Sequence, residues 1–383
     1  MLSPQKHLFD LPEEVTYLNI AAQSPLFKSA AKAGKEGIRQ KSLPYLITID
    51  DYFEPVVKLK KLFAQLIDTN NYERIVTVPS VSYGLANVTN NITLNKGDEI
   101  ILIEGQFPSN VYCWHRLAKK YDAKIITIKE PLIQENRGAT WNEQLLESIS
   151  DKTAVVALGN IHWSNGVIFE LKTIREKTKL HNALLIVDGS QTIGAFPFSI
   201  KEIQPDALLC AGYKWLFGPY GSSFAYYGSY FDQGTPIEEN WVNRLESENF
   251  AGLTDYNEQY KPFAQRYNVG QSGNFIYVKM QIAALEQILQ WDLNDIQRYC
   301  KEISKDCVHK ISEHGFQLDT PDDRTHHLFG VKVPAHIKMN DIKSTLKNNN
   351  VYVSYRGDYI RISAHLYNTF EDFDQLRKCL LSV

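Results

Sequence analysis

The sequence has few cysteines, no extended basic run and no long apolar run, and each absence excludes a class of protein. Its 5 cysteines are odd in number, scattered and without CxxC spacing, so neither a disulfide framework nor a zinc site is indicated. Because the net charge is −3 and no basic cluster is long enough to follow a phosphate backbone, we expect no nucleic-acid partner. No apolar run approaches the roughly 20 residues that span a bilayer, and the first residues lack a signal-peptide pattern. We therefore expect a cytoplasmic protein without a membrane partner.

Two missing motifs exclude further classes. No GxGxxG follows the first expected strand, which disfavours a nicotinamide-dependent oxidoreductase of the Rossmann type. The 10 histidines include one adjacent pair, in "THHLFG" at 325–330, but no HxxxH helix or carboxylate cluster accompanies it. A zinc hydrolase is therefore disfavoured, and we expect no bound metal.

What the sequence does contain is an alternation of short apolar runs with segments of helical periodicity. Nearly continuous apolar runs are typical of strands that are buried on both faces. The alternation predicts an α/β fold with a mainly parallel sheet covered by helices on both faces. The expected strands lie in "ERIVTVPS", "DEIILIEG", "AKIITIKE", "TAVVALGNI", "ALLIVDGS" and "DALLCAGY".

The pattern changes at about residue 280, which predicts a second and smaller domain. One long helix is expected over 277–315, followed by strand and helix elements up to the C-terminus. We therefore predict a large domain over 16–265 and a small α/β domain over 280–383, which the N-terminal residues 1–15 join.

Lys214 stands in "CAGYKWLFGPYG", directly after an apolar expected strand and before a Gly-Pro-rich loop. This position predicts a lysine that is shielded from bulk water. Desolvation lowers the pKa of an amine and makes it a nucleophile toward carbonyl carbon, which is the property of a Schiff-base lysine. The alternative is a lysine at the edge of the core whose ammonium extends to solvent.

Two other expected strands end in side chains that suit a ligand. Asp188 ends the apolar run "LLIVD", where a carboxylate requires a partner, although an Asp before Gly-Ser can also cap a helix. Ser80, Val81 and Ser82 follow another strand at an expected helix start, where free N–H groups and hydroxyls favour a phosphate. Serines also cap helices in the absence of any ligand. Ligands of open parallel sheets bind at the carboxyl ends of the strands, so these groups are candidates for one site.

A strand ending in Asp, a later strand ending in Lys and a hydroxyl-rich helix start are the parts needed to hold pyridoxal 5'-phosphate. In "VDGSQTIGAFPFSIKEIQPDALLCAGYKWLFGPYG" and "RISAHLYNT" the sequence resembles the class V aminotransferase and cysteine desulfurase family of fold-type I enzymes. The resemblance extends from "VTYLNIAAQSP" to "RISAHLYNTFEDFDQL" and so covers nearly the whole chain. It implies the fold-type I architecture and pyridoxal 5'-phosphate as cofactor.

The resemblance also implies a role for each matching residue. Lys214 would form the covalent link to the cofactor and move the substrate Cα proton, and Asp188 would pair with the pyridine nitrogen. Gln191 would bind the phenolic oxygen of the cofactor, and its phosphate would be bound by Val81, Ser82 and Tyr213. The resemblance also implies a homodimer with shared active sites, in which Gln271 and Ser272 would contact the cofactor of the neighbouring subunit.

Two departures from the family pattern concern the cofactor ring. Desulfurases of the family place a histidine over the ring, whereas this chain offers Phe107 in "EGQFPSN", and a phenyl group can stack but cannot transfer protons. Phe107 could alternatively be a core aromatic. Where the family often has an asparagine near the phenolic oxygen, the alignment places Trp163, with His162 and Asn165 beside it as substitutes.

The C-terminal motif predicts an amino-acid substrate. Arg361 in "YIRISAHLYN" would bind the α-carboxylate, because a guanidinium matches a carboxylate bidentately. Arg356, in "SYRGD", is a second candidate, although an arginine in a turn is usually solvated. The opening "TYLNIAAQSP" resembles the family's N-terminal stretch that folds over the site, which predicts Asn19, Ala21 and Gln23 as lining residues.

The resemblance leaves the reaction open. We expect an aminotransferase, with a lyase or epimerase of the cysteine lyase or kynureninase type as the alternative and a cofactor-holding regulator as the non-enzymatic one. A persulfide-forming cysteine desulfurase is disfavoured, because that mechanism needs a nucleophilic cysteine on a mobile loop. The stretches "FQLDTPDDRTHHLFG" to "SYRGDYIRISAHLYN" contain no cysteine, and the five thiols fall on expected helices or in a strand.

Overall fold

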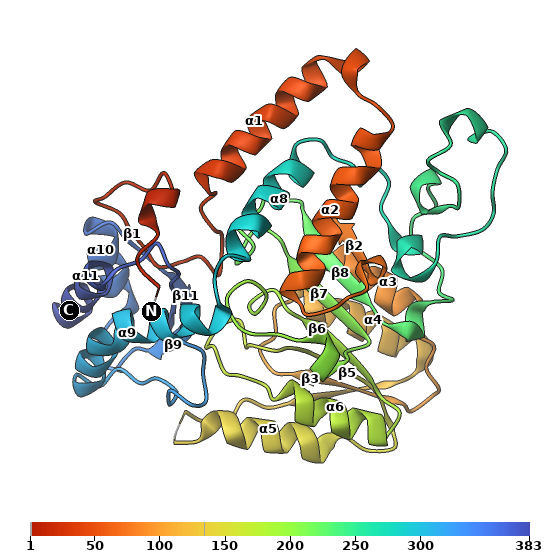
Figure 1. Cartoon of the computed structure of the whole chain (residues 1–383). Helices are drawn as coiled ribbons and strands as arrows, with labels where there is room; N and C mark the ends of the chain where they lie inside the picture. The colour runs from red at the N-terminus through yellow and green to blue at the C-terminus, as the bar shows by residue number, and fades with distance from the viewer. Residues whose placement is uncertain (1, 134) are drawn as a thin grey trace.

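A seven-stranded sheet forms the centre of the large domain in the computed structural model, which describes residues 2–133 and 135–383 (Figure 1). The neighbouring strands β4, β3, β5, β6 and β7 all run parallel to one another. Strand β8 runs antiparallel to both of its neighbours, β7 and β2. The prediction of a mainly parallel sheet is confirmed. The order is β2 (Ile75–Val78), β8 (Ser223–Tyr227), β7 (Ala207–Ala211), β6 (Leu184–Asp188), β5 (Thr153–Gly159), β3 (Glu99–Ile103) and β4 (Lys124–Ile128).

Both faces of this sheet are buried, which explains why its strands are nearly continuous apolar runs. Successive residues of β3 contribute to different hydrophobic cores, because side chains alternate across a strand. Ile101 packs in the core that contains Phe63 of one helical layer, whereas Ile100 packs in the core that contains Trp114 of the other. The covering helices are α2 (Asp50–Leu66), α3 (Val81–Asn90), α4 (Ser109–Tyr121), α5 (Arg137–Ser148), α6 (Leu171–Leu180) and the short α7 (Ile200–Ile203).

A separate three-stranded antiparallel sheet forms the small domain, in the order β11 (Ser354–Arg356), β12 (Tyr359–Ser363) and β9 (Leu328–Lys332). The chain start lies beside it: β1 (Thr16–Tyr17) pairs in parallel with β10 (Val351–Tyr352) (Figure 1). Strand β1 thus lies beside a strand of the C-terminal part, and the predicted domain boundary at residue 16 stays a prediction. The remaining helices of this domain are α9 (Leu293–Glu313), α10 (Met339–Asn348) and α11 (Phe370–Leu381).

The prediction of one long helix over 277–315 is wrong, because two helices occupy that range. Helix α8 (Tyr277–Ile288) packs against α1 (Lys28–Ser42) and α2, and α9 belongs to the small domain. The break occurs at Asp292, whose carboxylate accepts hydrogen bonds from the N–H groups of Asn294 at 2.7 Å and Asp295 at 3.3 Å. An Asp in this position starts a new helix rather than continuing the preceding one. No helix in the described part of the chain is long and apolar enough to cross a membrane.

Candidate active site

A cavity of about 260 Å³ lies at the carboxyl ends of the parallel strands. Its walls come from the segments that follow β2, β3, β5, β6 and β7, so residues far apart in the sequence meet there. The structure thereby brings together the predicted cofactor residues that one subunit would supply: Val81, Ser82, Phe107, Trp163, Asp188, Gln191, Tyr213 and Lys214.

Lys214 lies at the end of β7 with 7% of its surface exposed, so the prediction that it is shielded from water is confirmed. Its ammonium lies 5.3 Å from the centre of the Phe107 ring and lines the cavity, which excludes the solvent-reaching alternative. Burial lowers the pKa of Lys214 to about 8, although the charge of Asp188 acts in the opposite direction. The tight turn before the lysine requires Gly212, because a Cβ there would lie 2.3 Å from the carbonyl oxygen of Ser222.

Asp188 ends β6, and its carboxylate accepts a hydrogen bond of 2.9 Å from the N–H of Ser190. The chain turns repeatedly after Ser190 and the next helix, α7, begins at Ile200, so Asp188 does not cap a helix. The Ser190 hydroxyl accepts the N–H of Ala211 at 3.1 Å. This hydrogen bond links the end of β6 to the end of β7, and it thereby keeps the Asp188 carboxylate and the Lys214 amine in one cavity.

Gln191 is held by bonds on both ends of its amide. Its Oε1 accepts the indole N–H of Trp215 at 2.8 Å, and its Nε2 donates to the carbonyl of Ala21 at 3.2 Å. An amide nitrogen carries two hydrogens, so one N–H remains for a ligand in the cavity. The predicted bond from Gln191 to the cofactor's phenolic oxygen fits this arrangement and stays a prediction.

The first turn of α3 supplies the anion-binding part of the cavity. Ser80 caps the helix through its hydroxyl, which accepts the N–H of Tyr83 at 3.1 Å. The capping alternative therefore holds for Ser80. The backbone N–H groups of Val81 and Ser82 belong to the first helical turn, which has no intrahelical partners for its N–H groups. Both residues line the cavity together with Lys214.

The two aromatic residues at the cavity mouth contact each other edge to face, with 5.4 Å between the ring centres of Phe107 and Trp163. Phe107 is 41% exposed, which excludes the core-aromatic alternative. The Trp163 indole donates to the carbonyl of Gly105 at 2.6 Å, so its orientation is fixed. Among the substitutes near Trp163, His162 lines the cavity and Asn165 does not.

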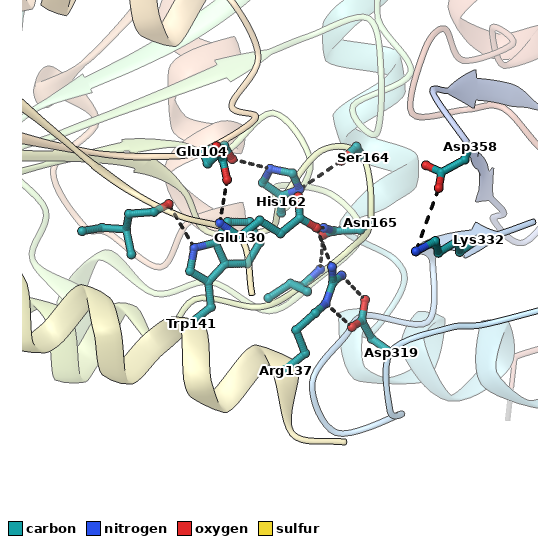
Figure 2. A network of polar contacts seen from close by, with 12 residues as sticks. Glu104, Glu130, Arg137, Trp141, His162, Ser164, Asn165, Asp319, Lys332 and Asp358 are labelled. Carbon is teal, nitrogen blue, oxygen red and sulfur yellow. Dashed lines mark hydrogen bonds and ion pairs between the residues drawn. The ribbon is translucent and has the colours of Figure 1, made fainter. Parts of the chain in front are cut away.

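A buried polar network holds the loop after β5 in place and links it to the small domain (Figure 2). The Asn165 amide donates to the Glu130 carboxylate at 2.8 Å, and Glu130 pairs with Arg137 of α5. Arg137 also donates twice, at 2.6 Å each, to Asp319, which precedes β9 in the chain, and both of these side chains are only 1% exposed. Neither Arg137 nor Asp319 was predicted from the sequence, because partners 182 positions apart leave no local signal.

Arg361 of β12 is buried and contacts the same loop. Its guanidinium donates to the Trp163 carbonyl at 3.1 Å and to the Ser354 hydroxyl at 3.2 Å. Burial and then the charge of Arg356 lower the pKa of Arg361 to about 9. Arg356 lies in strand β11 and is half-buried, rather than in a solvated turn.

The N-terminal stretch contacts residues around the cavity, and its predicted role as a lining segment stays a prediction. Asn19 accepts the Ser354 hydroxyl at 2.6 Å, and the Gln23 carbonyl accepts the Tyr17 hydroxyl at 2.7 Å; neither residue lines the cavity. The backbone around Asn19 pairs with Ser363 of the small domain. The Ser354 hydroxyl that donates to Asn19 also accepts a hydrogen bond from Arg361, so Asn19 lies close to Arg361. Ala21 contacts the cavity-lining Gln191 through its carbonyl.

Gln271 and Ser272 lie outside the cavity, at a second pocket of about 400 Å³. That pocket is also lined by Tyr52, Phe53 and Trp241, of which Trp241 is 39% exposed. The predicted contribution of Gln271 and Ser272 to the site of a neighbouring subunit stays a prediction.

Comparisons with known proteins give a family model, two distant relatives and a shared fold. A model of the family described as "Aminotransferase class-V" matches residues 51–376. An uncharacterized aminotransferase of Bacillus subtilis (strain 168), YcbU, is 28% identical over 316 residues, which cover 81% of this chain and 79% of that protein. A probable cysteine desulfurase of Halalkalibacterium halodurans is 26% identical over 335 residues, which cover 82% of this chain and 77% of that protein. The solved structure of a C-DES variant with glycine covalently linked to its PLP cofactor matches with a TM-score of 0.87 at 19% identity, and the match covers 99% of each chain.

Proposed function

We propose, because this chain belongs to the class V aminotransferase family, that it is a pyridoxal 5'-phosphate-dependent enzyme that transfers the α-amino group of an amino acid. The observation that carries the proposal is the buried Lys214 amine, which shares one cavity with the Asp188 carboxylate and the first turn of α3. The family supports the cofactor class, and the choice of transamination among the family's reactions is our inference.

The cavity residues fit the chemistry of this cofactor part by part. The lowered pKa of Lys214, about 8, makes a free amine available near neutral pH for a bond to an aldehyde carbon. Asp188 presents a carboxylate to a ring nitrogen from the carboxyl end of the neighbouring strand β6, and the first turn of α3 presents N–H groups to a phosphate. Phe107, exposed at the mouth, offers a flat apolar face for a ring.

Each side chain then has a definable task in the reaction. Bound pyridoxal 5'-phosphate supplies an electron sink for the charge that develops at the substrate Cα. With that cofactor bound, Asp188 would keep a proton on the ring nitrogen, Lys214 would accept and return the Cα proton through its Nζ, and Arg361 would orient the substrate by its α-carboxylate. The same lowered pKa makes the neutral amine the major form of Lys214 above about pH 8 in the chain without cofactor.

A β-lyase is the second candidate, because C-DES, whose fold this chain shares, is described as a cystine C–S lyase. The same lysine and carboxylate would serve elimination, and an epimerase would use them as well. A regulator that merely holds the cofactor would bind it without reacting with amino acids.

Absorbance separates these candidates. The purified protein is expected to be yellow, and an amino-group donor is expected to change its spectrum. Transamination then requires a keto-acid acceptor and converts it into the corresponding amino acid. Release of pyruvate or ammonia without an acceptor would indicate a lyase instead, and an unchanged spectrum with every amino acid tested would contradict an enzymatic role.

We also propose that two copies of the chain associate. A second copy covering the pocket around Trp241 would bury the exposed aromatic surface there and could bring Gln271 and Ser272 to its neighbour's cavity. This arrangement follows the family resemblance and the position of both residues outside their own cavity.

Replacing Arg361 is expected to affect substrates according to whether they carry a carboxylate. Arg361→Gln should raise KM for α-amino acids by about 10- to 100-fold, since a charge-assisted hydrogen bond contributes about 1.5–3 kcal/mol. KM for simple amines should change much less. Steady-state kinetics with alanine and ethylamine check this expectation, and an equal effect on both substrates would remove Arg361 from the carboxylate role.

No cysteine of this chain is expected to act as a persulfide-forming nucleophile. None of the described cavity-lining residues is a cysteine, and burial raises the pKa of Cys113 and of Cys307 to about 12. Burial likewise raises the pKa of Cys210, Cys300 and Cys379. A thiolate, not a thiol, is the attacking species, so these groups are inert near neutral pH.

The test supplies L-cysteine with a reductant and measures sulfide and alanine. Any sulfide that forms should be produced at the same rate by the Cys113→Ala variant, since Cys113 is the least buried of the five. Rapid release of both products that is lost on replacing one cysteine would overturn this expectation.

A further inference from the structure

Two arginine side chains lie beside the cavity without a carboxylate partner. Arg361 is only 1% exposed, Arg356 is half-buried, and the Nε of each has no hydrogen-bond acceptor among residues 2–133 and 135–383. Burial lowers the pKa of both, and for Arg361 the Tyr17 phenol acts against that effect. Arg137 shows the usual arrangement, because its buried guanidinium is paired with Asp319 and Glu130.

The β11–β12 hairpin directs both guanidinium groups to the same place. Ser354 lies opposite Arg361 in the register, and Arg356 is two residues further along β11, so the two arginines are diagonal neighbours on one face. Their guanidinium carbons lie 4.7 Å (Arg356) and 5.6 Å (Arg361) from the centre of the Trp163 ring. Neither arginine is among the residues that line the cavity, but Trp163, whose ring both guanidinium groups contact, lines it together with Phe107. The cationic pair therefore lies next to a residue of the cavity wall.

The local charge balance is positive. Lys214, Arg356 and Arg361 act on one another, since the charges of both arginines lower the pKa of the lysine. Asp188 and then Cys210 act on the pKa of Lys214 in the opposite direction. Burying a guanidinium without an anion costs free energy, and an anionic ligand that supplies the missing partner recovers it. The phosphate of the proposed cofactor would lie at the first turn of α3, and it would leave both arginines available.

We propose that Arg361 and Arg356 together bind an α-amino acid that carries a second acid group in its side chain. Arg361 takes the α-carboxylate, and Arg356 takes the side-chain carboxylate of a substrate such as glutamate or aspartate. This inference rests on the proposed function, since it names the substrate class of the same site. Trp163 is the positioning residue, because its carbonyl holds Arg361 and its ring carries both guanidinium groups.

Equilibrium binding of unreactive acids tests the pair without requiring turnover. Calorimetry on the full-length protein should show glutarate binding about 10- to 100-fold more tightly than butyrate, which has one carboxylate, because a hydrogen bond to a charged group contributes about 1.5–3 kcal/mol. In Arg356→Gln the ratio of the two dissociation constants should approach one, and in Arg356→Lys it should be intermediate. A glutarate affinity no better than that of butyrate, or no measurable glutarate binding, would overturn the proposal.

Lys343→Gln is the matched control. Lys343 is exposed on α10 and lies 5.2 Å from the ring centre of Tyr355, the neighbour of Arg356 on the opposite face of β11. This variant removes one positive charge from the same domain, and its glutarate-to-butyrate ratio should match that of the unmodified protein. An equal loss in Lys343→Gln and Arg356→Gln would mean that general electrostatic attraction, not a binding pair, causes the preference.

Steady-state kinetics test the diacid preference separately from the proposed aminotransferase activity. With a keto-acid acceptor, kcat/KM for glutamate should exceed that for glutamine, and Arg356→Gln should reduce the glutamate value about 10- to 100-fold more than the glutamine value. Equal rates with both donors would overturn the diacid preference and leave the proposed aminotransferase intact. No reaction with any amino acid would overturn both.

Discussion

Lys214→Ala is expected to abolish both the yellow colour of the cofactor-bound protein and its turnover, while the protein still folds. The side chain lines the cavity at the end of β7, and shortening it leaves the strand and Gly212 unchanged. The variant loses the covalent anchor and the base at once, so the rate should fall by at least about 10²- to 10⁴-fold. Visible absorbance, single-turnover kinetics and circular dichroism measure the three parts of this expectation.

Lys60 provides the matched comparison for Lys214. It is also buried, with 3% exposure, and its pKa is lowered to about 7, but its ammonium donates to Gln265 and Asn268 at 2.8 Å each and does not line the cavity. Borohydride reduction followed by mass spectrometry should therefore place the cofactor on Lys214 alone. A label on Lys60 would contradict the assignment and would show that a low amine pKa, rather than the position in the cavity, selects the lysine.

The attachment should also depend on pH with a definite sign. Because burial lowers the pKa of Lys214 to about 8, the neutral amine becomes the major form above that pH. The rate at which added cofactor reacts with the cofactor-free protein should rise as the pH rises through about 8 and then level off. A rate that falls over this range would contradict the role of the neutral amine.

Asp188→Asn is expected to retain much of the cofactor but to lose about 10²- to 10³-fold in kcat, the size of effect seen when one preorganised electrostatic group is removed. An asparagine Oδ1 can still accept the Ser190 N–H, so the turn after β6 should persist. What the variant lacks is the negative charge that holds a proton on the ring nitrogen.

The measurements for this variant are cofactor content by absorbance and kcat under saturating substrate. Ser190→Ala is the control, because it removes the bond from the Ala211 N–H to the Ser190 hydroxyl while keeping the carboxylate. It should lose far less activity than Asp188→Asn. Near-normal turnover in Asp188→Asn would show that the carboxylate only supports the local turn.

Several features of the site could be predicted from the sequence because they depend on local order along the chain. An apolar run that ends in Asp or Lys marks a strand and its end, and in a parallel sheet the carboxyl ends of neighbouring strands meet at one edge. That geometry alone brings Asp188 and Lys214 together with the start of α3. The helix break at Asp292 was also encoded locally, since Asp is a strong helix-capping residue, but the continuous periodicity on either side concealed it.

Other features were decided only by the tertiary structure, because they depend on contacts between distant segments. The sequence could not choose among His162, Trp163 and Asn165, since side-chain direction in an irregular loop follows from partners such as Gly105 and Glu130.

Pairing and register decided the rest of the site. The place of the N-terminal stretch beside the small domain follows from the pairing of its backbone with Ser363. The cationic pair of Arg356 and Arg361 arises from strand register, which sets two side chains on one face of a hairpin, and from the loop that carries Trp163 beneath them. The sequence by itself therefore determined the fold class and the residue types at the strand ends, while packing between distant segments decided which further side chains lie beside the cavity.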